Sequence, residues 1–272
     1  MTLLRQFRLI YPAALVFGGL LVAWEFSVRL AGVPPFILPP PSQIALRFFS
    51  DFPLLAEHFL VTLGEIALGF AIALVSAFTL ALAIFYSKTI ERVFYPIIIF
   101  LQNMPLFAIA PLLKLWMGFT IWPKVTVAAI IAFFPIVVNT VDGLRATDPD
   151  LIDLLRIFGA SQRQILQKVQ LPSALPFIFS GARVGITLSV VGAVIGEWVG
   201  AQAGLGYVML RANATLKTDL VFAAIFALAI LGVVLFGLLT LLECWALPWR
   251  RPSHDSYTIA NEHHLPPPKP AG

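Results

Sequence analysis

The length of its apolar blocks constrains this chain more than any other feature of the sequence. Such blocks lie at about 12–30, 62–86, 93–117, 125–141, 175–198 and 220–246. A helix needs about 20 residues to cross a bilayer, and each block is close to or above that length. Each block should be helical, because backbone exposed to lipid must satisfy its hydrogen bonds within its own segment. The sequence therefore predicts an all-α fold, a polytopic membrane helix bundle with about six transmembrane helices.

The composition excludes an ordinary soluble domain. Hydrophobic residues make up 59% of the 272 residues and charged residues 12%, with a mean hydropathy of +0.90. Soluble domains average about 45–50% and about 25% for these two classes. The formal net charge of +4 does not indicate nucleic-acid binding, because the basic residues cluster beside the apolar blocks, as membrane topology requires. We therefore expect the lipid bilayer, and no nucleic acid, as a partner.

The lysines and arginines also predict an orientation. With the N-terminus in the cytoplasm, the cytoplasmic segments hold more of these residues than the outer segments do, which satisfies the positive-inside rule. We expect both termini to be cytoplasmic. Residues 1–11 would form the N-terminal segment and residues 12–250 the transmembrane domain. Residues 251–272, which are rich in proline, would form a disordered cytoplasmic tail.

The segment 142–174 is the longest expected cytoplasmic loop, and it carries strong helix signals. Asp148 is a good N-cap before Pro149, and Gly159 is a good helix end. Between them one apolar stripe recurs at helical spacing. It consists of Leu151, Leu154, Leu155 and Phe158.

A second short helix is expected directly after the first. Ser161 and Gln164 have the spacing of a capping box at its start, and Pro172 and Pro176 are expected to end it before the fifth span. Two short amphipathic helices of this kind serve either to dock a cytoplasmic partner or to rest on lipid headgroups.

This loop resembles the cytoplasmic loop signature of ABC-importer permeases. That signature is Glu-Ala-Ala, a glycine four residues on, and an aliphatic residue just before Leu-Pro. The chain keeps the spacing and departs from the residue types only in its first three positions, with Asp for Glu and Leu-Leu for Ala-Ala. The resemblance implies that the loop couples to an ATPase through Asp153, Leu154, Leu155, Gly159, Ala160, Val169, Leu171 and Pro172.

The resemblance extends over most of the chain and is closest to the nitrate, sulfonate and taurine permeases, a group that includes carriers of pyrimidine-like thiamine precursors. The matching stretches are Trp24-Glu25, Phe36-Ile37-Leu38-Pro39, Met104-Pro105, Ala110-Pro111-Leu112, Leu175-Pro176, Gly181-Ala182-Arg183, Glu197, Gly204-Leu205-Gly206 and Pro248-Trp249.

That resemblance implies a type I importer fold in a bacterial inner membrane. It also implies a homodimer or paired permease, two ATP-binding cassette ATPase subunits and an extracytoplasmic solute-binding protein. ATP and Mg²⁺ would belong to the partner ATPase.

The chain itself carries no Gly-x-x-x-x-Gly-Lys-Ser/Thr run and no Cys/His spacing typical of a metal site. No nucleophile–base set or carboxylate pair at membrane depth is evident, so we do not expect an enzyme, a metal site or a resident cofactor. Energy must come from a partner or from an ion gradient. A gradient-driven secondary transporter is therefore the alternative, and it would need an intramembrane acidic relay and usually an internal repeat, neither of which is clear in this sequence.

Polar residues within the apolar blocks are costly in lipid and are therefore candidates to line a translocation path. Routine hydrogen bonding between helices is the alternative role. Glu197 is expected to be hydrated near the outer end, and Glu65 is expected at the interface. The candidates for the path are Gln102, Asn103, Asn139, Thr187, Ser189 and Glu197.

Glycine and proline in the spans predict packing and breaks. Gly181-x-x-x-Gly185 and Gly192-x-x-x-Gly196 allow another helix to approach the fifth span closely. Met104-Pro105, Pro111 and Pro135 either break the third and fourth spans or only kink them.

Overall fold

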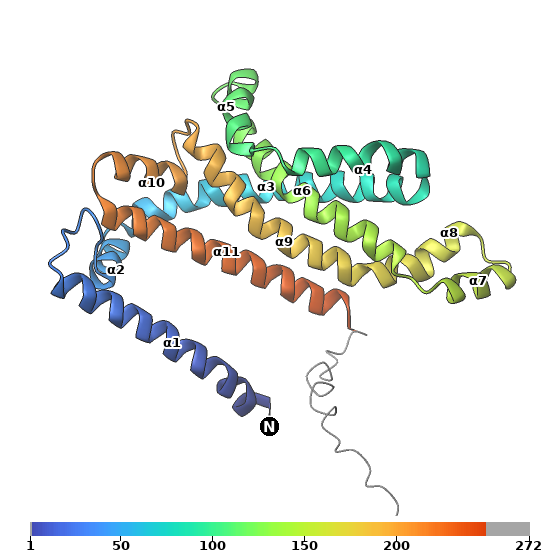
Figure 1. Ribbon diagram of the computed structural model, residues 1–272, viewed down its shortest axis with the longest axis horizontal. Helices are drawn as coiled ribbons and strands as arrows, with labels where there is room; N and C mark the ends of the chain where they lie inside the picture. The colour runs from blue at the N-terminus through green and yellow to red at the C-terminus, as the bar shows by residue number, and fades with distance from the viewer. Residues whose placement is uncertain (1, 249–272) are drawn as a thin grey trace, which may run out of the picture.

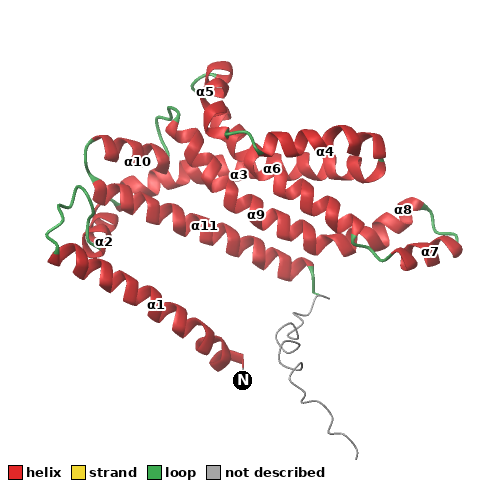
Figure 2. Cartoon of the chain, viewed as in Figure 1, coloured by secondary structure: helices red, strands yellow, loops and turns green. Residues whose placement is uncertain are grey.

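The computed structural model describes residues 2–248, with side chains from residue 15 onward, so the expected tail at 251–272 lies outside the described residues. Figure 2 shows helices joined by short loops, with no strand among the described residues. The helices are α1 (Thr2–Leu30), α2 (Pro41–Ser50), α3 (Phe52–Tyr86), α4 (Lys88–Gln102), α5 (Leu106–Met117), α6 (Trp122–Arg145), α7 (Pro149–Ile157), α8 (Gln162–Ile165), the π-helical segment η1 (Leu166–Gln170), α9 (Leu171–Trp198), α10 (Leu205–Ala214) and α11 (Thr218–Ala246). The all-α prediction is confirmed.

Within the described residues, four helical stretches are long and apolar enough to cross a membrane. They are α3, α6, α11 and the continuous run Gln162–Trp198, which joins α8, η1 and α9. The pair α4–α5 would be a fifth, but it is bent by 101°. The expected third span is therefore not one helix. Pro105 has no N–H to donate and disfavours helical geometry at Met104 before it, so the break falls there, whereas Pro111 and Pro135 lie inside α5 and α6.

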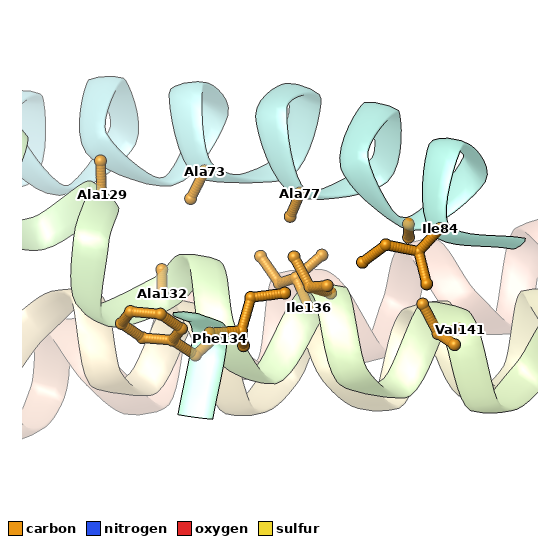
Figure 3. Close-up of a cluster of buried hydrophobic side chains, with 11 residues drawn as sticks. Ala73, Ala77, Ile84, Ala129, Ala132, Phe134, Ile136 and Val141 are labelled. Carbon is orange, nitrogen blue, oxygen red and sulfur yellow. The ribbon is translucent and has the colours of Figure 1, made fainter. Parts of the chain in front are cut away.

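The core lies where α3, α6 and α9 pack together. On the α3 side small residues line the contact, among them Ala73, Ala77 and Ala81, each at most 1% exposed. They meet Ile136 and Val141 of α6 across the gap drawn in Figure 3. Small side chains on one helix let the other helix approach closely, so the bundle is tight along α6.

The bundle has two distinct ends (Figure 1). At one end, which we call the loop end, lie α7 and α8 between the last turn of α6 and the start of α9. At the other, which we call the α10 end, lie α2 and α10, while α5 projects from the side of the bundle between α10 and α4 (Figure 1). α1 diverges from the bundle toward its N-terminus (Figure 1), and near its C-terminus Glu25 accepts hydrogen bonds from Ser42. α2 begins at Pro41 and α3 at Phe52, with Asp51 between them.

Candidate functional site

The helix α7 is fixed at both ends by its own sequence. At its start Asp148 Oδ1 accepts a hydrogen bond from the Asp150 N–H at 2.9 Å. At its end the Ala160 N–H donates to the Leu155 carbonyl at 3.0 Å and the Gly159 N–H donates to the Arg156 carbonyl at 2.9 Å. This is the Schellman arrangement, and Gly159 takes the left-handed φ of 78° that it requires. Both expected boundary signals of this helix are confirmed.

Most apolar side chains of α7 are exposed within the described part of the chain, and Ile152 and Leu155 are half-buried. No residue of α7 is buried. Ile157 is 82% exposed and the following Phe158 is 78% exposed, while Leu151 and Leu154 are also exposed. The expected apolar stripe therefore points away from the bundle. Exposed apolar clusters of this kind are typical of a surface that another protein or a membrane covers.

The second helix of the loop begins as expected and ends differently. The capping box between Ser161 and Gln164 is present. The expectation that Pro172 and Pro176 end this helix is wrong, because η1 carries it into α9 without a break. The Leu171 N–H donates to the Leu166 carbonyl, five residues back, and this wider turn precedes Pro172, which has no N–H to donate.

The loop is therefore exposed in its first half and anchored in its second. Asp153 is exposed and pairs with Arg156 at 2.9 Å. Ala160 is half-buried just after the turn at Gly159. Val169, Leu171 and Pro172 are half-buried, and Leu171 packs on a buried cluster formed by Leu144, Leu166 and Ala174. The arrangement is an exposed helix, α7, joined by a short turn at Gly159 to the continuous helical run Gln162–Trp198.

The residues expected to line a path are not brought together. Gln102 and Asn103 are exposed at the end of α4, and the Asn103 side chain donates to the Ile99 carbonyl at 2.7 Å. Asn139 is half-buried and donates to the Pro135 carbonyl at 2.8 Å within α6. Thr187 is exposed and donates to the Arg183 carbonyl within α9. Three of these side chains thus bond their own helix.

Ser189 and Glu197 lie elsewhere on α9, and both are fully buried. The Ser189 hydroxyl has no hydrogen-bond partner in the described part of the chain. The Arg183 side chain of α9 forms an ion pair with Glu243 of α11 at 2.8 Å.

An apolar groove of about 390 Å³ lies beside the break between α4 and α5. Ser76 of α3, Met104 at the break and Thr126 of α6 contribute to its walls, together with aromatic and aliphatic side chains. Gln102 and Asn103 lie next to this groove in the chain, although neither lines it.

Two acidic residues were misjudged from the sequence. Glu197 was expected to be hydrated and Glu65 to be interfacial, but both are 0% exposed. Glu65 pairs with Lys124 at 2.5 Å, and Glu197 accepts hydrogen bonds from Thr62 and Gly206. The sequence pattern gave no sign that Lys124 faces these carboxyls, because the three residues are far apart in the chain.

Comparison with known proteins places this chain in a family of membrane transport subunits. Residues 66–245 match the family described as "binding-protein-dependent transport system inner membrane component". The chain is 39% identical to the formylaminopyrimidine transport permease protein ThiX of Halalkalibacterium halodurans, over 91% of this chain and 98% of that protein. It is also 39% identical to the riboflavin transport system permease protein RibX of Chloroflexus aurantiacus, over 85% of this chain and 87% of that one.

A solved structure shares the fold. A chain of the inward-facing MetNI methionine ABC transporter superposes with a TM-score of 0.54 at 22% identity, covering 70% of this chain and 98% of that one.

Proposed function

Because this chain belongs to the family of binding-protein-dependent transport system inner membrane components, we propose that it couples to its ATPase through α7 and carries a small heterocyclic solute. Family membership makes it a multi-pass inner-membrane transport subunit of an ABC importer, with an ATPase and a solute-binding protein as partners, and not an enzyme. The proposal concerns the finer points: the docking element, the subunit arrangement, the orientation and the solute.

The observation that carries the docking proposal is the exposed apolar surface of α7. Ile157 and Phe158 are exposed at the end of α7, and hydrogen bonds cap this helix at both of its ends. A preorganised apolar projection loses little conformational entropy when a partner covers it. Its connection through η1 to α9 would carry a movement of the ATPase into the bundle. ATP and Mg²⁺ would be bound by that partner, and ATP binding would shift the permease between two conformations.

The test is co-purification of the ATPase in mild detergent with the wild-type protein, Phe158→Asp and Phe119→Asp. Phe119 is the matched control, because it is 79% exposed against 78% for Phe158 but lies after α5, near Lys124 at the start of α6 and Gly196 at the end of α9. We expect Phe158→Asp to release the ATPase and Phe119→Asp to retain it. Retention by both variants, or release by both, would exclude α7 as the docking element.

A second variant tests the loop geometry apart from its apolar surface. Gly159→Pro removes the N–H that donates to Arg156 and cannot take the φ of 78°, so it should distort the end of α7. Combined with Asp153→Lys, which breaks the pair with Arg156, it should also abolish co-purification.

The assembly we propose is a pair of permeases, either two copies of this chain or this chain with a similar one, with two ATPases at the loop end. Both termini would then be cytoplasmic. The loop end carries Lys88, Arg92, Arg145 and Arg163, in agreement with the positive-inside rule. Purification of two differently tagged copies through one tag would support a homodimer, whereas recovery of only one tag would favour a heterodimer.

For the solute we propose a small nitrogen heterocycle such as a pyrimidine-like thiamine precursor, with nitrate, sulfonates or taurine as the alternatives. The support is the chemistry of the named solutes: two relatives at 39% identity are named for heterocyclic solutes, a formylaminopyrimidine and riboflavin. Competition with uptake in cells tests this. A formylaminopyrimidine should compete with the native solute and taurine should not; the reverse result would assign the chain to the sulfonate branch.

A second candidate function, gradient-driven transport, is favoured by one observation only. The buried pair Glu65 and Glu197 is an intramembrane acidic cluster of the kind that the sequence did not reveal. The ATP dependence of uptake separates the two functions.

A further inference from the structure

The α10 end contains a buried charge cluster that the proposed coupling function does not use. It consists of Glu65 on α3, Lys124 in the first turn of α6 and Glu197 in the last turn of α9. Both carboxyls belong to residues that are 0% exposed, and the Lys124 side chain is 13% exposed. α10 begins beside them, at Gly204 to Gly206. Four helices therefore meet at one set of ionisable groups.

The hydrogen bonds around Glu197 use both of its oxygens. The Thr62 hydroxyl donates to Glu197 Oε1 at 2.6 Å, and the Gly206 N–H donates to Oε2. The Thr62 oxygen in turn accepts from the Leu205 N–H at 2.9 Å. The start of α10 is thus attached to α3 and α9 through this one carboxyl.

The carboxyl oxygens of Glu65 have fewer hydrogen-bond partners than those of Glu197. Glu65 Oε1 faces the Lys124 ammonium at 2.5 Å, yet neither carboxyl oxygen of Glu65 has a hydrogen bond with conventional donor geometry in the described part of the chain. Glu65 follows Thr62 by three residues on the same face of α3, and Thr62 bonds Glu197, so the two carboxyls lie on neighbouring turns of the same buried contact. Two neighbouring carboxyl groups can bond to each other only if one of them carries a proton.

The neighbouring groups do not supply a second positive charge. His58 of α3 accepts the Gly204 N–H on Nδ1 at 3.0 Å, so that nitrogen carries no proton and the ring is neutral. Lys114 of α5 lies over the ring of Phe119, and no ion pair joins it to either carboxyl among the described residues. Glu57 is exposed, and Tyr207 of α10 packs against His58. With both carboxyls ionised the cluster would hold one uncompensated negative charge out of contact with water.

We propose that Glu65 and Glu197 share one bound proton, which makes this cluster a proton-binding site with Lys124 as its single cation. One proton brings the formal charge of the three groups to zero and provides the donor that joins the two carboxyls. An uncompensated buried charge costs several kcal/mol, and adjacent carboxyls disfavour double ionisation. The proton belongs to the pair rather than to either residue. It helps to hold α10 against α3 and α9.

Infrared difference spectroscopy tests the proposal on the full-length protein in lipid nanodiscs, without ATPase or solute. At neutral pH the wild-type protein should show the carbonyl stretch of one protonated carboxylic acid that shifts in D₂O. Glu65→Gln and Glu197→Gln should each lose that band, because the remaining carboxylate then pairs alone with Lys124. Glu91→Gln, which alters an ion pair at the loop end, should keep it.

Absence of the band from the wild-type protein would overturn the proposal, whatever the variants do. Survival of the band in Glu65→Gln or in Glu197→Gln would overturn sharing, because one residue would then hold the proton alone. Lys124→Gln removes the only cation, so both carboxyls should become protonated and the band should grow about twofold; an unchanged band would contradict the charge count. None of these results depends on whether α7 binds an ATPase.

Discussion

At the scale of residues, glycines on α9 set how closely it can approach α6. A Cβ on Gly192 would lie 2.7 Å from the Ala128 Cα, and one on Gly196 would lie 2.7 Å from the Lys124 Cα. These are backbone atoms, which cannot move aside cheaply. The two glycine motifs read from the sequence therefore face a specific neighbour, and the same contact brings Lys124 to the end of α9.

Gly192→Ala should lower the thermal unfolding midpoint of the detergent-solubilised protein, because overpacking of a tight contact costs about 1–3 kcal/mol. Gly237→Ala on α11 is the matched control. Its added Cβ meets nothing within 4 Å, so it should leave the midpoint unchanged or raise it slightly through better helix propensity. Equal shifts in the two variants would show that α6–α9 packing is not limiting.

At this scale, the helix caps could be predicted from the sequence because each acts on nearby backbone groups. Asp148, Gly159 and Ser161 act on backbone groups within a few residues, so their roles could be read directly from the chain. The Glu65–Lys124–Glu197 cluster could not be predicted, because its members are brought together only when α3, α6 and α9 pack. Glu197 was therefore taken as hydrated when it is buried.

At the scale of elements, α8, η1 and α9 form one continuous helical run, which the sequence did not predict. Prolines normally end helices, so Pro172 and Pro176 were expected to separate the loop from the span. The π turn of η1 keeps the helix intact for 37 residues, about 55 Å at the usual rise. The spans themselves follow from hydropathy, but the 101° break at Pro105 depends on how α4 packs back toward α3.

Deletion of Gln167 tests whether the exact register of η1 is required. Removing one residue should convert the π turn to α geometry, so that the Pro172 ring meets the carbonyl of the preceding turn and kinks the connection between α8 and α9. We expect the protein to insert in the membrane but to lose co-purification of the ATPase. Gln167→Ala is the control: Gln167 is exposed, so its truncation should retain the ATPase. If the deletion also retains it, the orientation of α8 is not set by η1.

At the scale of the whole molecule, the structure separates two ends with different chemistry. The loop end presents a helix whose apolar side chains are largely exposed, whereas the α10 end holds the buried charge cluster. An ATPase can dock only on the cytoplasmic face, so the account requires the loop end to be cytoplasmic. Fold class and family could be predicted from the sequence because they depend on long apolar blocks and a spaced motif.

Cysteine labelling tests this orientation. In a Cys244→Ser background, which removes the only cysteine of the chain, Gln162→Cys places a thiol at the loop end and Asn213→Cys places one at the α10 end. Both native residues are exposed. A membrane-impermeant maleimide should label Gln162→Cys only in inside-out vesicles and Asn213→Cys only in right-side-out vesicles. The opposite pattern would invert the topology.

The most direct test of the central claim is solute uptake into proteoliposomes that contain this chain, its ATPase and its solute-binding protein. The account predicts uptake that requires ATP and Mg²⁺ on the ATPase side, persists when ionophores collapse all ion gradients, and is lost in Phe158→Asp while Phe119→Asp remains active. Uptake that continues without ATP and stops when the gradients are collapsed would contradict it and would make this chain a gradient-driven carrier.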